Sequence, residues 1–317
     1  MNAQAVLPLF PASAGFGRSE ADAPALRRRA GVEYFDLGVR EILNRADSPR
    51  LPFDWTINPY RGCEFGCTYC YARYTHGFFE TATPEDFETK IFVKRRAAER
   101  LRERLKRHDF HGQPIALGTA TDPYQPAERH FGITRALLEV FRDTEGLTLS
   151  ITTKSPLVTR DLDLLTELDR KHALEIQVSI TTVDPRLARD LEPAAPDART
   201  RVATVERLAE AGLSVTVNAM PILPGINDSE AVLRPLFEAA RAAGAREVGG
   251  MPLFLRPASR KVFFPWLTQR FPELVGMYQR LYRDRDYLDT AARDQLLSTY
   301  RRLKLEYGFP AARVGRA

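Results

Sequence analysis

The chain has 317 residues, enough for one large domain with a full hydrophobic core. Its 44% hydrophobic and 27% charged residues are typical of a soluble globular protein. Only seven of the 46 basic residues are Lys, so the net charge of +5 comes mainly from Arg. This charge is compatible with a nucleic-acid partner but does not require one. No apolar run approaches the ~20 residues of a membrane span, so no membrane-spanning helix is expected.

The first 30 residues contain no basic start, and Pro8 and Pro11 interrupt their apolar run. This pattern does not fit a signal peptide, so we expect residues 1–30 to be a disordered lead and the protein to be cytoplasmic. From about Val32 short apolar runs alternate with amphipathic stretches, the pattern of βα units.

The runs predict six strands: Trp55–Asn58, Pro114–Thr119, Leu147–Thr152, Leu174–Thr181, Leu213–Ala219 and Glu247–Phe254. Helices are predicted at Val93–His108, Ile133–Arg142, 161–171 and 200–212, with a further helix ending at Ala243. Strands that alternate with helices predict an α/β fold, a parallel sheet curved into a partial TIM-type (β/α)6 barrel. We expect this core to span residues 31–260 and a helical C-terminal extension to span residues 261–317.

All three cysteines of the chain, Cys63, Cys67 and Cys70, lie within eight residues, which excludes a disulfide framework. Their C-x3-C-x2-C spacing allows three thiolates to bind three irons of a [4Fe–4S] cluster and to leave the fourth iron open. Gly62 and Gly66 would provide the turns of such a loop. A structural zinc site is the alternative, but it needs a fourth ligand such as His76.

Other distinctive segments follow predicted strands: GTATDPYQPAE, ITTKS, the E-P-x7-R run from Glu192 to Arg201, and PILPGIND. The carboxyl ends of parallel strands meet at one edge of the sheet, so these segments are expected to surround the cysteine loop. Arg201 could hold a carboxylate through two parallel hydrogen bonds.

With the segment FDWTINPYRGCEFGCTYCYARYTHGF, these motifs resemble the spore photoproduct lyase-like branch of the radical S-adenosylmethionine (SAM) superfamily, from about Glu33 to the C-terminus. The resemblance implies that SAM binds the open iron and is cleaved to a 5′-deoxyadenosyl radical, which abstracts hydrogen from a substrate. It also implies a low-potential electron donor such as flavodoxin or ferredoxin. The residues matched to SAM contacts are Tyr69, Thr119, Thr121, Asp122, Lys154, Ser179, Arg201 and Gly225.

The resemblance fails at one position. Spore photoproduct lyase returns hydrogen from a further cysteine near the end of its second strand, and the corresponding LGTATDPYQ contains none. Tyr124 is the candidate replacement, while Gln125, Glu128 and His130 are candidates for substrate contact or simply for a solvated loop. Three hypotheses therefore stay open: a radical SAM enzyme of unknown substrate, a DNA lesion repair enzyme, and a non-catalytic metal-binding interaction protein.

Overall fold

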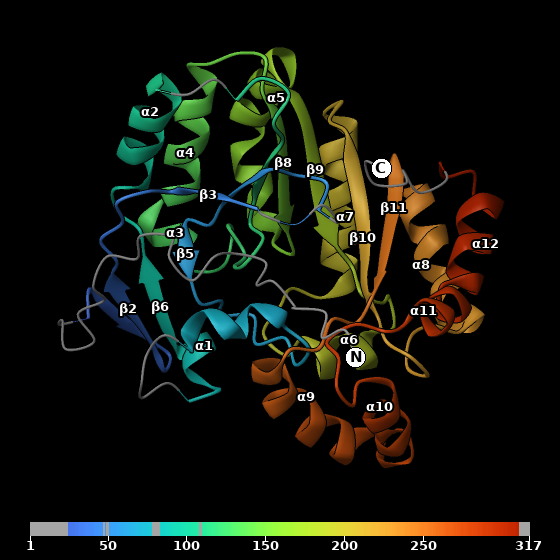
Figure 1. The fold of residues 1–317 in the computed structure, drawn as a ribbon. Helices are drawn as coiled ribbons and strands as arrows, with labels where there is room; N and C mark the ends of the chain where they lie inside the picture. Colours follow the sequence, from blue (N-terminus) through green and yellow to red (C-terminus); the bar gives the residue numbers. More distant parts are fainter. Residues whose placement is uncertain (1–24, 47, 49–50, 78–82, 108–109, 311–317) are drawn as a thin grey trace.

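The computed structural model describes residues 25–46, 48, 51–77, 83–107 and 110–310. Six strands form a parallel sheet in sequence order, and each one matches a strand predicted above (Figure 1). They are β4 (Trp55–Ile57), β7 (Ile115–Leu117), β8 (Thr148–Thr153), β9 (Ala173–Ser179), β10 (Val215–Ile222) and β11 (Glu247–Pro252). The sheet is open, with β11 at one edge and the antiparallel β3 (Leu43–Arg45) at the other, so the predicted partial barrel is confirmed as an unclosed α/β fold.

Most of the helices that connect the strands cover the outer face of the sheet (Figure 1). The burial of β4 and β7 at every position shows that the sheet is covered on both faces, as in parallel α/β proteins. The connecting helices are α2 (Ala97–Arg107), α3 (Glu128–Phe131), α4 (Ile133–Arg142), α5 (Leu162–Lys171), α6 (Pro185–Leu191), α7 (Ala198–Glu210) and α8 (Glu230–Ala242).

A second, four-stranded sheet was not predicted. It consists of β1 (Arg27–Arg29), β2 (Val32–Asp36), β6 (Lys90–Val93) and β5 (Tyr60–Arg61), in that order. It lies at the side of the main sheet (Figure 1), and β5 leads directly into the cysteine loop. Most of the predicted lead, residues 1–24, lies outside the described residues, while β1 lies within its last part.

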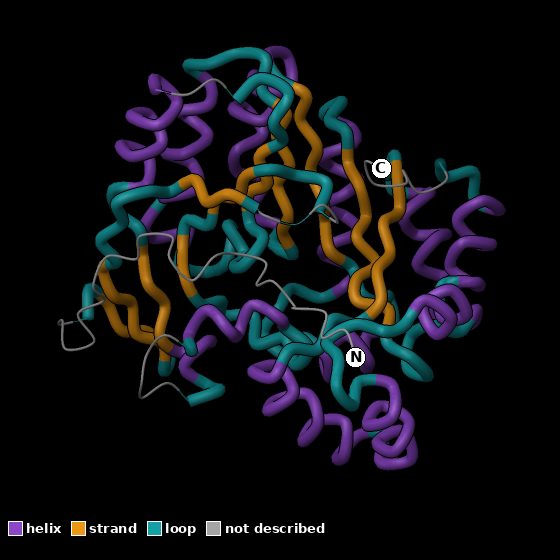
Figure 2. Tube along the Cα trace, viewed as in Figure 1, coloured by secondary structure: helices purple, strands orange, loops and turns teal. Residues whose placement is uncertain are grey.

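Beyond β11 the described chain is helical, as expected for the C-terminal extension (Figure 2). Its elements are α9 (Pro257–Arg270), η3 (Pro272–Leu274), α10 (Val275–Leu281), α11 (Thr290–Leu296) and α12 (Ser298–Glu306). Phe263 of α9 and Tyr278 of α10 share an apolar cluster with Phe65 and Tyr69 of the cysteine loop. The extension therefore packs on the loop itself. The lengths and compositions of the described helices rule each of them out as a membrane span.

Candidate active site

The cysteine loop leaves β5 through Gly62, whose backbone is left-handed with a φ of +87°. A Cβ atom there would come within 2.9 Å of the carbonyl oxygens of Phe87 and Lys90, so a side chain has no room. The amide of the next residue, Cys63, donates a hydrogen bond of 2.9 Å to the Phe87 carbonyl. This close approach needs glycine, and it fixes the position from which the first thiol extends.

All three thiols are free; Cys67 is buried, whereas Cys63 and Cys70 are partly exposed. Burial raises the pKa of each thiol, to about 12 for Cys67. Binding of a metal cluster would therefore displace their protons. Within the described parts of the chain, no three His, Cys, Asp or Glu side chains meet as ligands of one metal ion. A cubane places each thiolate on a different iron, whereas a structural zinc ion needs four ligands around one centre.

Side chains from distant parts of the chain hold the backbone of the loop. Arg73 donates from Nη2 to the carbonyl of Cys67 at 3.0 Å, and an ion pair of 2.5 Å with Glu88 holds Arg73 in turn. Ser259, near the start of α9, donates from Oγ to the carbonyl of Cys70 at 2.9 Å. The carbonyls of two cysteines are thus fixed, which orients this part of the loop before any metal binds.

A buried carboxylate, Glu192, lies at the centre of a polar network beside the loop. The hydroxyl of Tyr69 donates to Glu192, and Thr181 Oγ1 donates to the same oxygen at 2.7 Å. The carboxylate is 2.5 Å from Arg201 Nη2 and 3.8 Å from Lys154 Nζ. Burial alone would raise the pKa of Glu192, but the two cations outweigh burial and hold it below its usual value. Glu192 is therefore an anion that joins three of the predicted cofactor residues.

Ser179 takes part in this network through its backbone, because its carbonyl accepts a hydrogen bond of 3.0 Å from Arg201 Nη1. The Arg201 side chain is 1% exposed, and its guanidinium is held by this carbonyl and by Glu192. The carboxylate that pairs with Arg201 here is thus the first residue of its own E-P-x7-R motif. Contacts of Ser179 and Arg201 with SAM stay predictions.

The segment after β7 is tied to the cysteine loop, as the convergence of strand ends predicts. Thr121 Oγ1 donates to the carbonyl of Gly62 at 2.5 Å. The carbonyl of Thr119 accepts a hydrogen bond from the hydroxyl of Tyr71, the residue after the last cysteine. Both threonines therefore lie against the loop, and their contacts with SAM stay predictions.

Asp122 joins the ends of β7 and β8. Its carboxylate accepts hydrogen bonds of 2.7 Å from the amide of Lys154 and from the hydroxyl of Thr153. Burial raises the pKa of Asp122 above its ordinary value, although these donors oppose the effect. The carboxylate thus orients the backbone that carries Lys154, a second role beside its predicted contact with SAM.

Tyr124, the predicted hydrogen donor, is 1% exposed and belongs to the main hydrophobic core. Burial raises the pKa of Tyr124 well above its usual value, and the nearby carboxylates of Asp161 and Glu128 add to the effect. These carboxylates belong to η2 (Pro156–Asp161) and α3. The burial of Tyr124 is that of an ordinary core residue. The role of Tyr124 as a hydrogen donor stays a prediction.

The other candidates for substrate contact divide by exposure. Gln125 is fully buried and clasps the cysteine loop, donating to the carbonyl of Gly62 and accepting from the amide of Glu64, each at 3.1 Å. Glu128 is also fully buried and forms an ion pair of 2.8 Å with Arg160. Only His130 is exposed. The hydrogen bonds of Gln125 and the ion pair of Glu128 within the protein account for the burial of these two side chains.

The PILPGIND turn packs on the C-terminal extension. Gly225 has a φ of +73°, and a Cβ atom there would lie 3.3 Å from the side chain of Leu274. The fully buried Asn227 donates to the carbonyl of Thr181 at 3.0 Å, which ties the turn to the Glu192 network. The contact of Gly225 with SAM stays a prediction.

Several residues of the site were not assigned a role from the sequence, among them Glu192 and Ser259. Glu192 appeared only as the first residue of a motif, although its pairing with Arg201 is a natural explanation of that spacing. Ser259 carried no signal, because a serine 189 residues from its partner in the sequence shows no local pattern.

The radical SAM superfamily model matches residues 57–234 of the chain. An uncharacterized protein of Mycobacterium tuberculosis is 37% identical over 267 residues, covering 84% of this chain and 78% of that protein. An uncharacterized protein of Methanocaldococcus jannaschii is 28% identical over 202 residues, covering 64% of this chain and 72% of that protein.

Among solved structures, spore photoproduct lyase complexed with dinucleoside spore photoproduct has the same fold. Its TM-score is 0.65 at 16% identity, and the match covers 87% of this chain and 79% of that one. A mutant of the same lyase, with bound AdoMet and dinucleoside spore photoproduct, matches with a TM-score of 0.64 at 15% identity. Since the family model spans more than half of its length, the chain belongs to the radical SAM superfamily.

Proposed function

We propose that this protein cleaves SAM reductively and uses the resulting 5′-deoxyadenosyl radical to abstract hydrogen from a substrate. A [4Fe–4S] cluster held by Cys63, Cys67 and Cys70 would supply the electron and the open iron. The observation that carries the proposal is the cysteine loop: three thiols, no further cysteine in the sequence, and loop carbonyls fixed by Arg73 and Ser259.

The network around Glu192 supports a bound SAM beside this loop. Lys154 Nζ lies 5.9 Å from the centre of the Tyr69 ring, so a cation and an aromatic face are available next to the last cysteines. Tyr69, Thr119, Thr121, Asp122, Lys154, Ser179, Arg201 and Gly225 would form the SAM site. Glu192 would orient Tyr69 and Lys154 rather than touch the reacting atoms.

Anaerobic reconstitution with iron and sulfide, followed by a reductant and SAM, tests the proposal. We expect about four irons per chain and the release of 5′-deoxyadenosine. Cys67→Ala should abolish both, because two thiolates cannot hold the cubane. Bound zinc without SAM cleavage would instead favour the metal-binding interaction protein. We also propose that the protein is cytoplasmic and that flavodoxin or ferredoxin donates the electron to the cluster.

DNA lesion repair is the second candidate, favoured by the shared fold with spore photoproduct lyase. A repair reaction that returns hydrogen from a cysteine is disfavoured, because all three cysteines lie in the cluster loop. Incubation of the reconstituted enzyme with lesion-containing DNA decides this point: efficient repair would require a different hydrogen donor, and its absence would leave the substrate to be identified by deuterium transfer to 5′-deoxyadenosine.

A further inference from the structure

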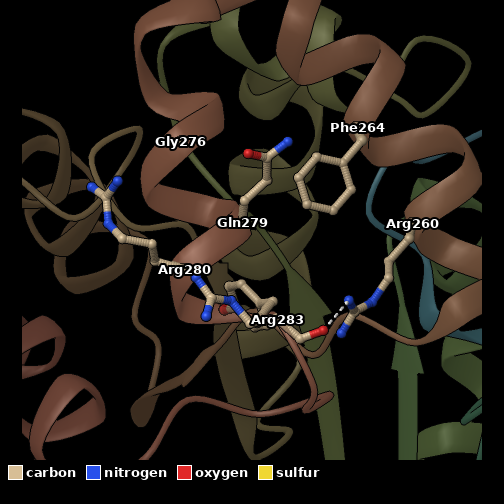
Figure 3. Close-up of a pocket in the computed structure, with 7 residues that line it drawn as sticks. Arg260, Phe264, Gly276, Gln279, Arg280 and Arg283 are labelled. Carbon is tan, nitrogen blue, oxygen red and sulfur yellow. Dashed lines mark hydrogen bonds between the residues drawn. The ribbon is translucent and has the colours of Figure 1, made fainter.

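A hollow of about 640 Å³ lies between α9 and α10, on the C-terminal extension. Figure 3 shows the side chains around it: Phe264 projects from α9, and Gln279 and Arg280 project from α10. The complete lining consists of Arg260, Phe264, Gly276, Gln279, Arg280, Tyr282 and Arg283. Three of these seven residues are arginines, and no acidic residue lines the hollow. We call it the α9–α10 groove.

The charge around the groove is only partly neutralised, because Arg260 lies 4.0 Å from Asp286, which follows the groove segment. From Pro257 to Arg283 the sequence contains five basic residues and a single acidic one, Glu273. Arg280 and Arg283 are exposed, and neither guanidinium forms a hydrogen bond or ion pair with any described residue. Other arginines of the extension do have partners: Arg270 pairs with Asp190, Arg285 with Asp289, and Arg301 with Asp294. The two free guanidinium groups therefore leave ten N–H donors on one surface without protein acceptors.

The third arginine makes the groove rigid. Arg260 donates from Nη2 to the carbonyl of Arg285 at 2.7 Å and from Nε to the carbonyl of Leu255 at 3.1 Å. Its Nη1 reaches the carbonyl of Arg283 at 3.5 Å, the dashed line in Figure 3. Arg260 thus joins α9 to the segment after α10, so the groove is preformed rather than created by binding.

Helix α9 also joins the groove to the cysteine loop. Ser259, which bonds the carbonyl of Cys70, precedes Arg260 by one residue and Phe264 by five. At a rise of 1.5 Å per residue, this places Phe264 only ~8 Å further along the helix axis. The same helix therefore carries a contact to the cysteine loop and part of the groove lining, on different sides of its axis.

We propose that the α9–α10 groove binds the phosphodiester backbone of a nucleic acid, which is then the substrate or carries it. Guanidinium groups match phosphate oxygens through paired hydrogen bonds, and Phe264 offers an aromatic face on which a base can stack. An acidic peptide would use the arginines but would leave the aromatic face without a planar partner. This inference rests on the proposed function only where it makes the bound nucleic acid the substrate of the radical chemistry. Binding of nucleic acid in the groove does not depend on that chemistry.

Fluorescence anisotropy with a labelled single-stranded oligodeoxynucleotide tests the groove in the full chain. We expect R280A/R283A to bind about tenfold more weakly at ~0.1 M salt, whatever the oligonucleotide sequence. The slope of log K against log salt should fall by about 1.4, because about 0.7 is lost per phosphate contact on a single strand. Phe264→Leu keeps the apolar packing and should weaken binding by a further several-fold.

The matched control is R301A/R302A, which removes the same charge from α12 at another part of the extension. It should leave affinity and salt slope close to those of the unmodified protein. Equal losses in both double variants, unchanged binding by R280A/R283A, or equally tight binding of polyglutamate would each overturn the proposal. Oligonucleotide binding without SAM cleavage would sink only the proposed function, and SAM cleavage without binding would sink only this inference.

Discussion

The carboxylate of Glu192 lies 2.5 Å from the guanidinium of Arg201, and at most 2% of either residue is exposed to solvent. The pair closes the E-P-x7-R motif on itself and holds the hydroxyl of Tyr69. Because the partners lie beside the cysteine loop, disturbing one of them tests stability and cofactor binding together.

Glu192→Gln should lower the free energy of unfolding by about 3–5 kcal/mol, since it leaves Arg201 buried without a counter-charge. Denaturant unfolding of the metal-free protein measures this loss, and equilibrium dialysis measures the expected weakening of SAM binding. Glu230→Gln is the control, because Glu230 pairs with Arg234 at the surface. Similar unfolding curves for the two variants would contradict the central position given to Glu192.

Ser259→Ala should loosen the cysteine loop, because the carbonyl of Cys70 loses its hydrogen bond at a cost of about 1 kcal/mol. In the reconstituted protein we expect a chelator to remove iron several-fold faster. Thr268→Ala in the same helix is the control, since Thr268 bonds only the carbonyl of Phe264 at an exposed position. Identical rates of iron loss would show that α9 does not support the loop.

Gly62→Ala should be much more costly than Gly212→Ala. Both glycines are left-handed, with φ values of +87° and +83°, so each substitution carries a strain of about 1–2 kcal/mol. Only at Gly62 does the added Cβ meet backbone oxygens at 2.9 Å, whereas nothing lies within 4 Å at Gly212. Urea unfolding of the two variants measures the difference, which we expect to exceed about 2 kcal/mol. Equal losses would mean that the backbone near Gly62 relaxes freely.

Lys94→Met should stabilise the fold near neutral pH. Burial, with a smaller contribution from Arg61, lowers the pKa of Lys94 from 10.5 to about 7. Below pH 7 the folded chain carries this buried charge at full cost, on the order of 4 kcal/mol. As the pH rises from 7 to 10.5 the folded lysine loses its proton first, so the cost disappears. Unfolding at pH 6 and pH 10 measures this: the gain from Met should be large at pH 6 and small at pH 10.

The pattern of the sequence was sufficient for the parallel strands of the main sheet, but not for its antiparallel edge strand β3. All six parallel strands lie where apolar runs alternate with amphipathic stretches, and α4 has the predicted bounds, Ile133–Arg142. The second sheet was missed because its strands have two to five residues, too few to show a period of two. Val93 illustrates the error: it was assigned to a helix, but it ends β6, and α2 begins only at Ala97.

In the site, the metal ligands were readable because their chemistry is local: three thiols, two spacings and a glycine before them. The residues around them were only partly readable, because the partner of a buried charge depends on the fold. Arg201 could have paired with any carboxylate, and Glu192 and Ser179 became its partners only once α6, α7 and β9 were packed together. Longer contacts, such as the hydrogen bond from Tyr69 to Glu192 across 123 residues, follow from topology and not from local pattern.

The hydrogen bond from Ser259 to Cys70 has a consequence for biosynthesis. A ribosome makes the cysteines 189 residues before it makes the serine that secures them, so a nascent chain carries these thiols on an incompletely anchored loop. We therefore expect iron–sulfur insertion to follow release of the finished polypeptide. A chain that stops before α9 should accumulate without iron even if its sheet has folded.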